Sequence, residues 1–228
     1  MSDVAPSVES SSRARARRLL LAAALVSGLI FAALATTAAR GELESWDTDG
    51  FAALYSGEAS HAPGGATGTS SPIVHRAVAL GNRVGGWEVL LVVVAGFSIV
   101  LAVRGRRDLA VVVVVGSAVA VLVPVLKDAF GRLSPFAEPG AYGFPSGHAM
   151  GPMAVAASCV VVLWHTSWRL PALIAGTIAV AAIGVAAISD GGHWPSDVVG
   201  GWALALAWVL VVAWAYVTWR WRGTMRDA

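Results

Sequence analysis

Six long apolar segments constrain the fold of this chain more than any other feature. They cover approximately 19–37, 87–103, 109–126, 147–166, 170–188 and 198–218. A helix needs about 20 apolar residues to cross roughly 30 Å of hydrocarbon. Inside lipid, every backbone polar group has to be paired within its own segment, so helices are favoured even where valines cluster, as at 111–115. The segments therefore predict an all-α, polytopic membrane protein with a six-transmembrane-helix bundle.

The composition supports a membrane protein and argues against a nucleic-acid partner. Hydrophobic residues make up 57% of the 228 residues and charged residues only 13%, whereas soluble domains carry about 25% charged residues. No basic stripe with interleaved aromatic residues is present, which is the pattern expected of a nucleic-acid-binding surface. We therefore expect one integral membrane domain and no nucleic-acid partner.

The arginines at 13–18 precede the first apolar segment and suggest where the membrane domain begins. We expect residues 1–16 to form a disordered cytoplasmic tail, residues 17–220 to form the membrane domain, and residues 221–228 to form a second cytoplasmic tail. A cleaved signal peptide is the alternative. It is less favoured because the first apolar run is nearly twenty residues long and further spans follow.

The distribution of basic residues predicts the topology. With the N-terminus in the cytoplasm, eleven of the 16 lysines and arginines fall in inside segments and five fall outside, as the positive-inside rule requires. Both termini are then cytoplasmic and the long loop 39–86 is outside, with 72–80 as a short amphipathic surface helix. The Ala-, Val-, Gly- and Trp-rich composition suggests a GC-rich bacterial genome, so the expected location is the bacterial inner membrane.

The segment His193-Trp194-Pro195-Ser196-Asp197 carries the first set of chemical groups. A spacing of four places His193 and Asp197 on one face of a helix. A carboxylate that accepts the Nδ1 hydrogen bond leaves Nε2 of the imidazole free to act as a nucleophile or base. Pro195 suits the first turn of a helix. Taken alone, the pair is also compatible with an interfacial histidine followed by an acid at a helix start.

The segment Pro145-Ser146-Gly147-His148 carries the second set, at the start of another apolar segment. The backbone N–H groups of Ser146, Gly147 and His148 would lie at a helix N-terminus, which is a favourable site for an anion. The Ser146 hydroxyl adds a donor, and His148 can protonate a leaving oxygen. Both histidine segments and Lys127 fall on the outer face in the predicted topology, so we expect them to form one composite active site.

These segments resemble the type 2 phosphatidic acid phosphatase family, the lipid phosphate phosphatases related to vanadium haloperoxidases. The family pattern is Lys-x6-Arg-Pro, then Pro-Ser-Gly-His, then Ser-Arg-x5-His-x3-Asp. The second motif is complete at 145–148, the third keeps His193 and Asp197, and the first begins with Lys127. The resemblance covers about residues 87–202 and the six-span layout.

The resemblance implies a mechanism and a substrate class. His193 would attack phosphorus to form a phosphohistidine, Asp197 would orient it, and His148 would protonate the leaving alcohol before water hydrolyses the intermediate. Lys127, Ser146 and Gly147 would bind the phosphate, with no metal or other cofactor. The substrate would be a lipid phosphate in the membrane, such as phosphatidic acid, phosphatidylglycerol phosphate, or a polyprenyl phosphate or diphosphate. The motifs do not distinguish among these lipids, and nothing in the sequence defines an oligomeric state.

Two family arginines are missing from this chain. Ser134 stands at the arginine position of the first motif, and Ala186 and Ala187 replace the Ser-Arg pair of the third. Losing one preorganised donor costs about 3 kcal/mol, so two losses would slow catalysis by roughly 10⁴ or more. Arg132 lies two residues before the expected position, and we expect it to replace part of this charge as a substrate-binding residue. Asp190 adds a carboxylate that would repel a phosphate dianion, pair with a nearby cation, or favour a substrate that carries an amine.

The missing arginines leave two alternatives to a phosphatase. The chain could be a catalytically degenerate, lipid-phosphate-binding or scaffolding membrane protein, or it could transfer the phosphoryl group to a second lipid. Retention of His148, His193 and Asp197 argues for catalysis, because a protein that only binds lipid does not need a nucleophile and an acid.

Two further patterns concern packing and metal binding. Gly200-Gly201 in the last apolar segment predicts a close helix-packing point. Asp47-Thr48-Asp49-Gly50 is similar to the start of a calcium loop, but Phe51 and Ala52 occupy the fifth and sixth positions, where a ligand and a glycine are needed. We therefore predict no calcium site there.

Overall fold

The computed structural model describes residues 5–42, 45–55, 72–136 and 140–226. Its elements are α1 (Ala5–Ala39), α2 (Ser45–Leu54), α3 (Pro72–Val84), α4 (Trp87–Val103), α5 (Arg107–Ser117), the 3₁₀ helix η3 (Ala118–Leu122), α6 (Val123–Phe130), α7 (Gly147–Leu163), α8 (Arg169–Ser189) and α9 (Pro195–Arg226). Extended pairing in these residues is confined to an isolated antiparallel bridge between Leu133 and Tyr142. The predicted all-α fold is confirmed.

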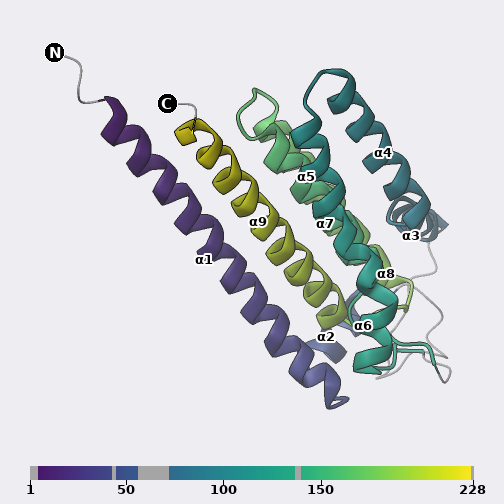
Figure 1. Ribbon diagram of the computed structural model, residues 1–228. Coiled ribbons are helices and arrows are strands. Elements are labelled where there is room, and N and C mark those ends of the chain that lie inside the picture. The colour runs from purple at the N-terminus through teal and green to yellow at the C-terminus, as the bar shows by residue number, and fades with distance from the viewer. Residues whose placement is uncertain (1–4, 43–44, 56–71, 137–139, 227–228) are drawn as a thin grey trace.

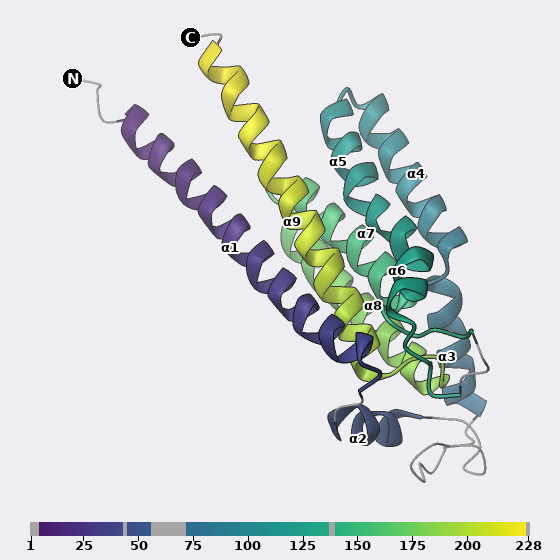
Figure 2. The same ribbon diagram turned by 60° about the horizontal axis from the view of Figure 1, so that its bottom comes forward.

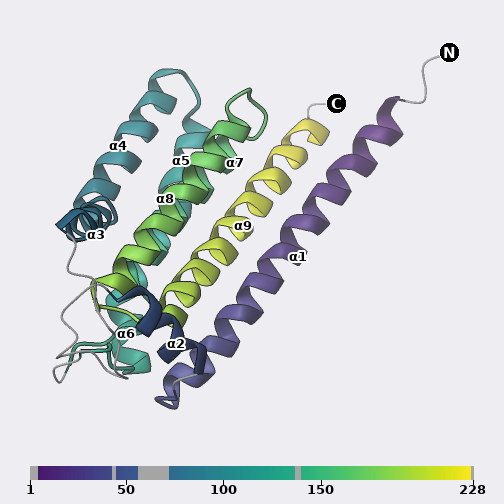
Figure 3. The ribbon, with the colours of Figure 1, turned by 180° about the vertical axis from the view of Figure 1, so that it is seen from behind.

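The long helices run side by side in one slanted array (Figure 1). Helix α9 lies between α1 and α7, and α7 also packs against α5 and α8. Helices α4 and α5 form the edge of the array away from α1 (Figure 1). The N-terminal end of α1 and the C-terminal end of α9 lie at the same end of the bundle. Helix α2, α6 and the turns before α7 and α9 gather at the opposite end (Figures 2 and 3).

All six predicted spans lie in helices, but their lengths differ from the prediction. Among the described residues, four helical segments are long and apolar enough to cross a membrane: Ala14–Ala39, Arg107–Phe130, Arg169–Ser189 and Pro195–Arg220. Helices α3 and α4 form a pair bent by 52° that counts as a fifth span when taken together, and α7 is an apolar helix of 17 residues. Length and composition therefore give four or five spans, and the count of six is not confirmed.

The third predicted span is helical but irregular in its middle. Five residues, Ala118–Leu122, adopt a 3₁₀ helix between α5 and α6. Pro124 lies at the start of α6, and a proline removes one backbone donor and clashes with the carbonyl four residues earlier. A tighter 3₁₀ turn accommodates this interruption. The break sets the direction of α6, which carries Lys127 to the end of the bundle where the histidine segments lie.

The predicted tails are partly helical. Helix α1 begins at Ala5 and α9 continues to Arg226, while residues 1–4 and 227–228 lie outside the described residues, and the expected bounds of the membrane domain stay a prediction. A helix that has already nucleated in the membrane extends one residue at a time at low cost, and alanine and arginine are strong helix formers. The surface helix expected at 72–80 is present and extends to Val84 as α3.

Buried packing inside the array relies on small side chains. The cluster around Met150 joins α7 to η3 and α9, and its members Ala154 and Ala205 are fully buried. Gly116 of α5 faces the hydroxyl of Ser158 on α7 so closely that a Cβ would clash with it. Small residues at such contacts let membrane helices approach closely, which fixes the position of the α7 N-terminus relative to α9.

Candidate active site

The turn between α8 and α9 positions His193 and Asp197. Gly191 adopts a positive φ of 84°, a conformation that favours glycine because it has no Cβ. Trp194 precedes the first residue of α9, and its backbone N–H donates to Asp197 Oδ2 at 2.8 Å. A carboxylate at the third helical position that accepts from the N-cap backbone is half of a capping box. Asp197 is therefore fixed by the helix start itself, and its side chain is fully buried.

His193 lies beside this carboxylate without a hydrogen bond to it. Its Nδ1 is 3.7 Å from Asp197 Oδ2, longer than a hydrogen bond. Nδ1 is buried, and the described residues offer it no hydrogen-bond partner. The predicted proximity of the pair is present, while the predicted Nδ1 hydrogen bond is not formed in this arrangement.

The turn before α7 brings His148 to the same place. The rings of His148 and His193 have centroids 6.4 Å apart and are inclined by 57°. Ser146 is the residue before the first helical residue of α7, and its backbone N–H donates to the Asp197 carbonyl oxygen at 3.0 Å. The two histidine segments are thus tied together by their backbones.

This hydrogen bond changes the predicted anion site. The Ser146 N–H was expected to face outward with those of Gly147 and His148, but it is occupied by Asp197. The Ser146 hydroxyl is fully buried and makes no hydrogen bond with the described residues. The first N–H groups of α7 have no acceptor inside their own helix, so those of Gly147 and His148 remain the candidates for binding an anion.

Arg132 lies in a buried polar network next to Asp197. Its Nη2 donates to Asp47 Oδ2 of α2 at 2.8 Å, and its Nη1 donates to Ser196 Oγ at 2.6 Å. Nη1 is also 3.5 Å from Asp197 Oδ1. The Arg132 side chain is only 3% exposed and that of Asp47 only 1%. The guanidinium that we expected to bind substrate therefore contacts protein carboxylates. Arg132 is also absent from the residues that line the pocket beside His193.

Asp47 completes this network from the N-terminal part of the chain. Its Oδ1 accepts the Ser196 backbone N–H and its Oδ2 accepts the Ser196 hydroxyl, both at 2.8 Å. Ser196 is the second residue of α9, so a carboxylate here also interacts favourably with the helix dipole. Asp47 was not among the predicted site residues, and its sequence context resembles only the start of a calcium loop. The only feature that could have pointed to it is that Asp47 lies in the loop 39–86, which was predicted to be on the same outer face as the histidine segments.

A pocket opens beside His193 and contains Lys127. Its volume is about 420 Å³, and Lys127, Asp128, Ser134, Tyr142 and His193 are among the residues that line it, a size within the usual range for small-ligand sites. Lys127 is the only lysine or arginine among the described lining residues. The pocket therefore offers one cation, Lys127, one carboxylate, Asp128, and one candidate nucleophile, His193.

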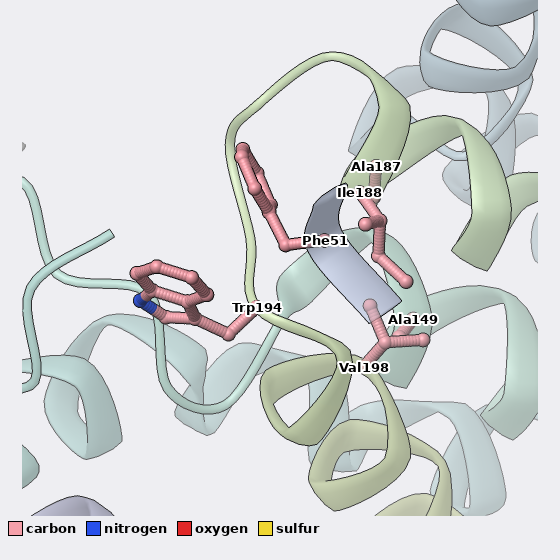
Figure 4. Close-up of a cluster of buried hydrophobic side chains, with 6 residues drawn as sticks. All are labelled: Phe51, Ala149, Ala187, Ile188, Trp194 and Val198. Atoms are coloured by element: carbon pink, nitrogen blue, oxygen red, sulfur yellow. The ribbon is translucent and has the colours of Figure 1, made fainter. Parts of the chain in front are cut away.

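The positions of the two missing arginines differ in their surroundings. Ser134 lines the pocket, and its hydroxyl donates to the Ala141 carbonyl oxygen at 3.0 Å. Ala187 is 3% exposed and belongs to an apolar cluster with Phe51, Ala149, Ile188, Trp194 and Val198 (Figure 4). Ala186 faces Gly81 of α3 so closely that a Cβ on the glycine would be 2.6 Å away. Helices α2 and α3 thus fill the side of the site that carries the third motif.

Asp190 lies at the edge of the site. Asp190 caps the end of α8, and its backbone N–H donates to Ala186. It is exposed and does not line the pocket. Within the described part of the chain, no group of three or more His, Cys, Asp and Glu side chains forms a candidate metal site.

The described helices form an integral membrane bundle that carries two histidines and one lysine at one end. The PAP2 superfamily matches residues 107–222, just over half of the 228 residues, and the chain belongs to this family. The structure is similar to the crystal structure of a transmembrane PAP2-type phosphatidylglycerolphosphate phosphatase from Bacillus subtilis, with a TM-score of 0.62 and 18% identity over 83% of this chain and 93% of that one. No curated protein matches the chain. The family expected from the motifs is confirmed.

Proposed function

We propose that this protein hydrolyses a lipid phosphate or diphosphate at the membrane surface through a phosphohistidine. The observation that carries this proposal is the convergence of His148 and His193, whose rings lie 6.4 Å apart beside the pocket that contains Lys127. Two imidazoles at that distance leave room for a phosphoryl group between a nucleophile and an acid. The B. subtilis protein of the same fold is a phosphatidylglycerolphosphate phosphatase, which supports keeping this lipid among the candidate substrates.

The proposed reaction has two steps. His193 Nε2 attacks phosphorus, the bond from phosphorus to the lipid oxygen breaks, and His148 donates a proton to that leaving oxygen. Water then attacks the phosphohistidine, with His148 as the base, to release inorganic phosphate and restore His193. Lys127 and the N–H groups at the start of α7 neutralise charge on the phosphoryl oxygens, which is the main protein contribution to phosphoryl transfer.

The decisive experiment is phosphate release by the purified protein in detergent. The substrates are phosphatidic acid, phosphatidylglycerol phosphate, and polyprenyl phosphates and diphosphates. The variants are His193→Ala and, as a matched control, His165→Ala, whose histidine is exposed between α7 and α8. Release is expected to vanish in the first variant and to persist in the second. Equal release by wild type and His193→Ala would rule out a histidine nucleophile at this position.

Binding without hydrolysis is a second candidate function, favoured by the charge of the pocket. Lys127 is the single cation among its described lining residues, and Arg132 is engaged by Asp47. Such a protein would bind lipid phosphate and release nothing. Retained binding of a lipid phosphate by both wild type and His193→Ala, together with no release from any substrate, would favour this alternative.

A further inference from the structure

We infer that Asp47 of α2 is a positioning residue: it keeps the Arg132 guanidinium engaged, so that the Asp197 carboxylate stays available to orient His193. This inference deepens the proposed function and rests on it. It assigns a role in the reaction to the segment before α3, which lies outside the residues matched by the family. It also gives Arg132 a role other than binding substrate.

Arg132 and His193 both lie close to the Asp197 carboxylate. Arg132 Nη1 lies 3.5 Å from Asp197 Oδ1, and His193 Nδ1 lies 3.7 Å from Oδ2. Both distances are just longer than a hydrogen bond, and both Oδ1 and Nδ1 lack a hydrogen-bond partner among the described residues. A small movement of the Arg132 guanidinium or of the His193 imidazole toward Asp197 would complete a hydrogen bond. The two groups approach different oxygens of one carboxylate. Since a buried unpaired polar group is costly, a movement of the carboxylate toward Arg132 comes at the expense of its approach to His193.

Asp47 and Ser196 hold Arg132 back. One terminal nitrogen of the guanidinium donates to Asp47 and the other to Ser196, at 2.8 and 2.6 Å. Ser196 in turn donates its hydroxyl and its backbone N–H to Asp47. Both terminal nitrogens are therefore satisfied without Asp197. Charge-assisted bonds of this kind are among the stronger hydrogen bonds in proteins, and their burial shields them from water.

The effect of removing Asp47 follows from these contacts. The guanidinium would keep its charge, because arginine is not deprotonated in proteins, and Asp197 would be the nearest remaining carboxylate. Arg132 would then close the 3.5 Å gap to Asp197 Oδ1 and draw the carboxylate toward itself. Oδ2 would move further from His193 Nδ1, which already lies 3.7 Å away, and the imidazole would be held less firmly for attack by Nε2.

The test compares Asp47→Asn with the double variant Asp47→Asn/Arg132→Gln. Asp49→Asn is the matched control, because Asp49 is exposed on the same helix. Asp47→Asn is expected to lower kcat by roughly 10- to 100-fold, by analogy with the outer-shell groups that orient metal-bound histidines, with KM little changed. The double variant should recover much of this loss, because no arginine then competes for Asp197. A general loss of folding does not produce such a recovery.

Two results would overturn the inference. One is wild-type kcat in folded Asp47→Asn. The other is a double variant with a higher KM and less activity than Asp47→Asn, which would make Arg132 a substrate ligand. Should Asp47→Asn not fold, Ser196→Ala removes the second group that holds Arg132 and is expected to lower kcat in the same way. An unchanged kcat in Ser196→Ala would equally refute the inference.

A second measurement separates this inference from the proposed function. Modification of each histidine by diethyl pyrocarbonate is followed by mass spectrometry, with the exposed His165 as internal reference. Asp47→Asn is expected to change the rate at His193 by at least about threefold relative to His165, and Asp49→Asn is expected to leave it unchanged. A change at His193 in a protein that releases no phosphate would support the positioning role and refute the phosphatase. Phosphate release by the wild type, with an unchanged modification rate at His193 and an unchanged kcat in Asp47→Asn, would support the phosphatase and refute the positioning role.

Discussion

Gly201 of α9 lies directly against the carbonyl oxygen of Ser146. A Cβ at Gly201 would be 2.7 Å from that oxygen and 3.2 Å from both Ala149 Cβ and Met150 N. The turn that presents His148 therefore rests on the backbone of the helix that presents Asp197. The close packing predicted for Gly200-Gly201 is confirmed, and Gly200 makes a similar contact with the ring of Phe144.

Gly201→Ala is expected to destabilise the protein and to displace the His148 turn. Overpacking in a tight core costs about 1–3 kcal/mol, and the contacted atoms are two backbone atoms and the Ala149 Cβ, none of which can rotate away. Thermal unfolding in detergent measures the change in Tm. Gly96→Ala on α4 is the control, because no heavy atom lies within 4 Å of its added Cβ. An equal Tm for both variants would contradict the proposed close contact.

His148→Ala is expected to slow hydrolysis in a way that depends on the leaving group. A general acid contributes about 10²–10⁴-fold when the departing alcohol needs a proton. A lipid alcohol needs that proton, whereas an aryl phosphate such as p-nitrophenyl phosphate departs as a stable anion. The kcat for a lipid phosphate should therefore fall much more than the kcat for the aryl phosphate. Equal losses with both substrates would argue that His148 binds the phosphoryl group instead.

Part of the site could be predicted from the sequence because its geometry is local. The spacing of His193 and Asp197 within one helix start, and the position of Ser146 before α7, follow from helix geometry. The convergence of the two segments with Lys127 followed from placing span ends on one side of the membrane. Neighbouring residues thus decided the two helix starts, and the positions of the span ends decided the convergence.

The remaining part depends on long-range pairing that the sequence does not encode locally. Asp47 and Arg132 are 85 positions apart, and nothing near either residue shows that α2 returns to cap α9. The same pairing explains why Arg132 does not line the pocket, which was not predicted because its partner Asp47 was not foreseen. The irregular 3₁₀ segment before Pro124 was likewise not predicted, because apolar content indicates a span and not its hydrogen-bonding pattern.

Ser134→Arg is expected to increase activity by adding a cation to the pocket. Ser134 lines the pocket together with Lys127 and His193, and an arginine is long enough to extend into it from this loop. One preorganised donor is worth roughly 10²–10³ in rate, so a gain in kcat/KM of about 10-fold or more is expected even with imperfect geometry. Ser134→Gln is the control, since it adds length without charge. A kcat/KM for Ser134→Arg no higher than that for Ser134→Gln would show that charge in the pocket does not limit the reaction.

Ala187→Arg is expected to fail where Ser134→Arg succeeds, although both restore a family arginine. Ala187 is 3% exposed and packs in the cluster with Phe51 and Trp194 (Figure 4). Inserting a larger side chain costs about 1–3 kcal/mol, and burying an unpaired charge adds several kcal/mol. We expect a large fall in Tm or no folded protein. Ala141→Arg, on an exposed residue that lines the pocket, controls for the added charge and should keep the wild-type Tm. A folded Ala187→Arg protein with raised kcat/KM would contradict this expectation. It would mean that α2 and Phe51 can move aside at little cost and let the arginine reach the site.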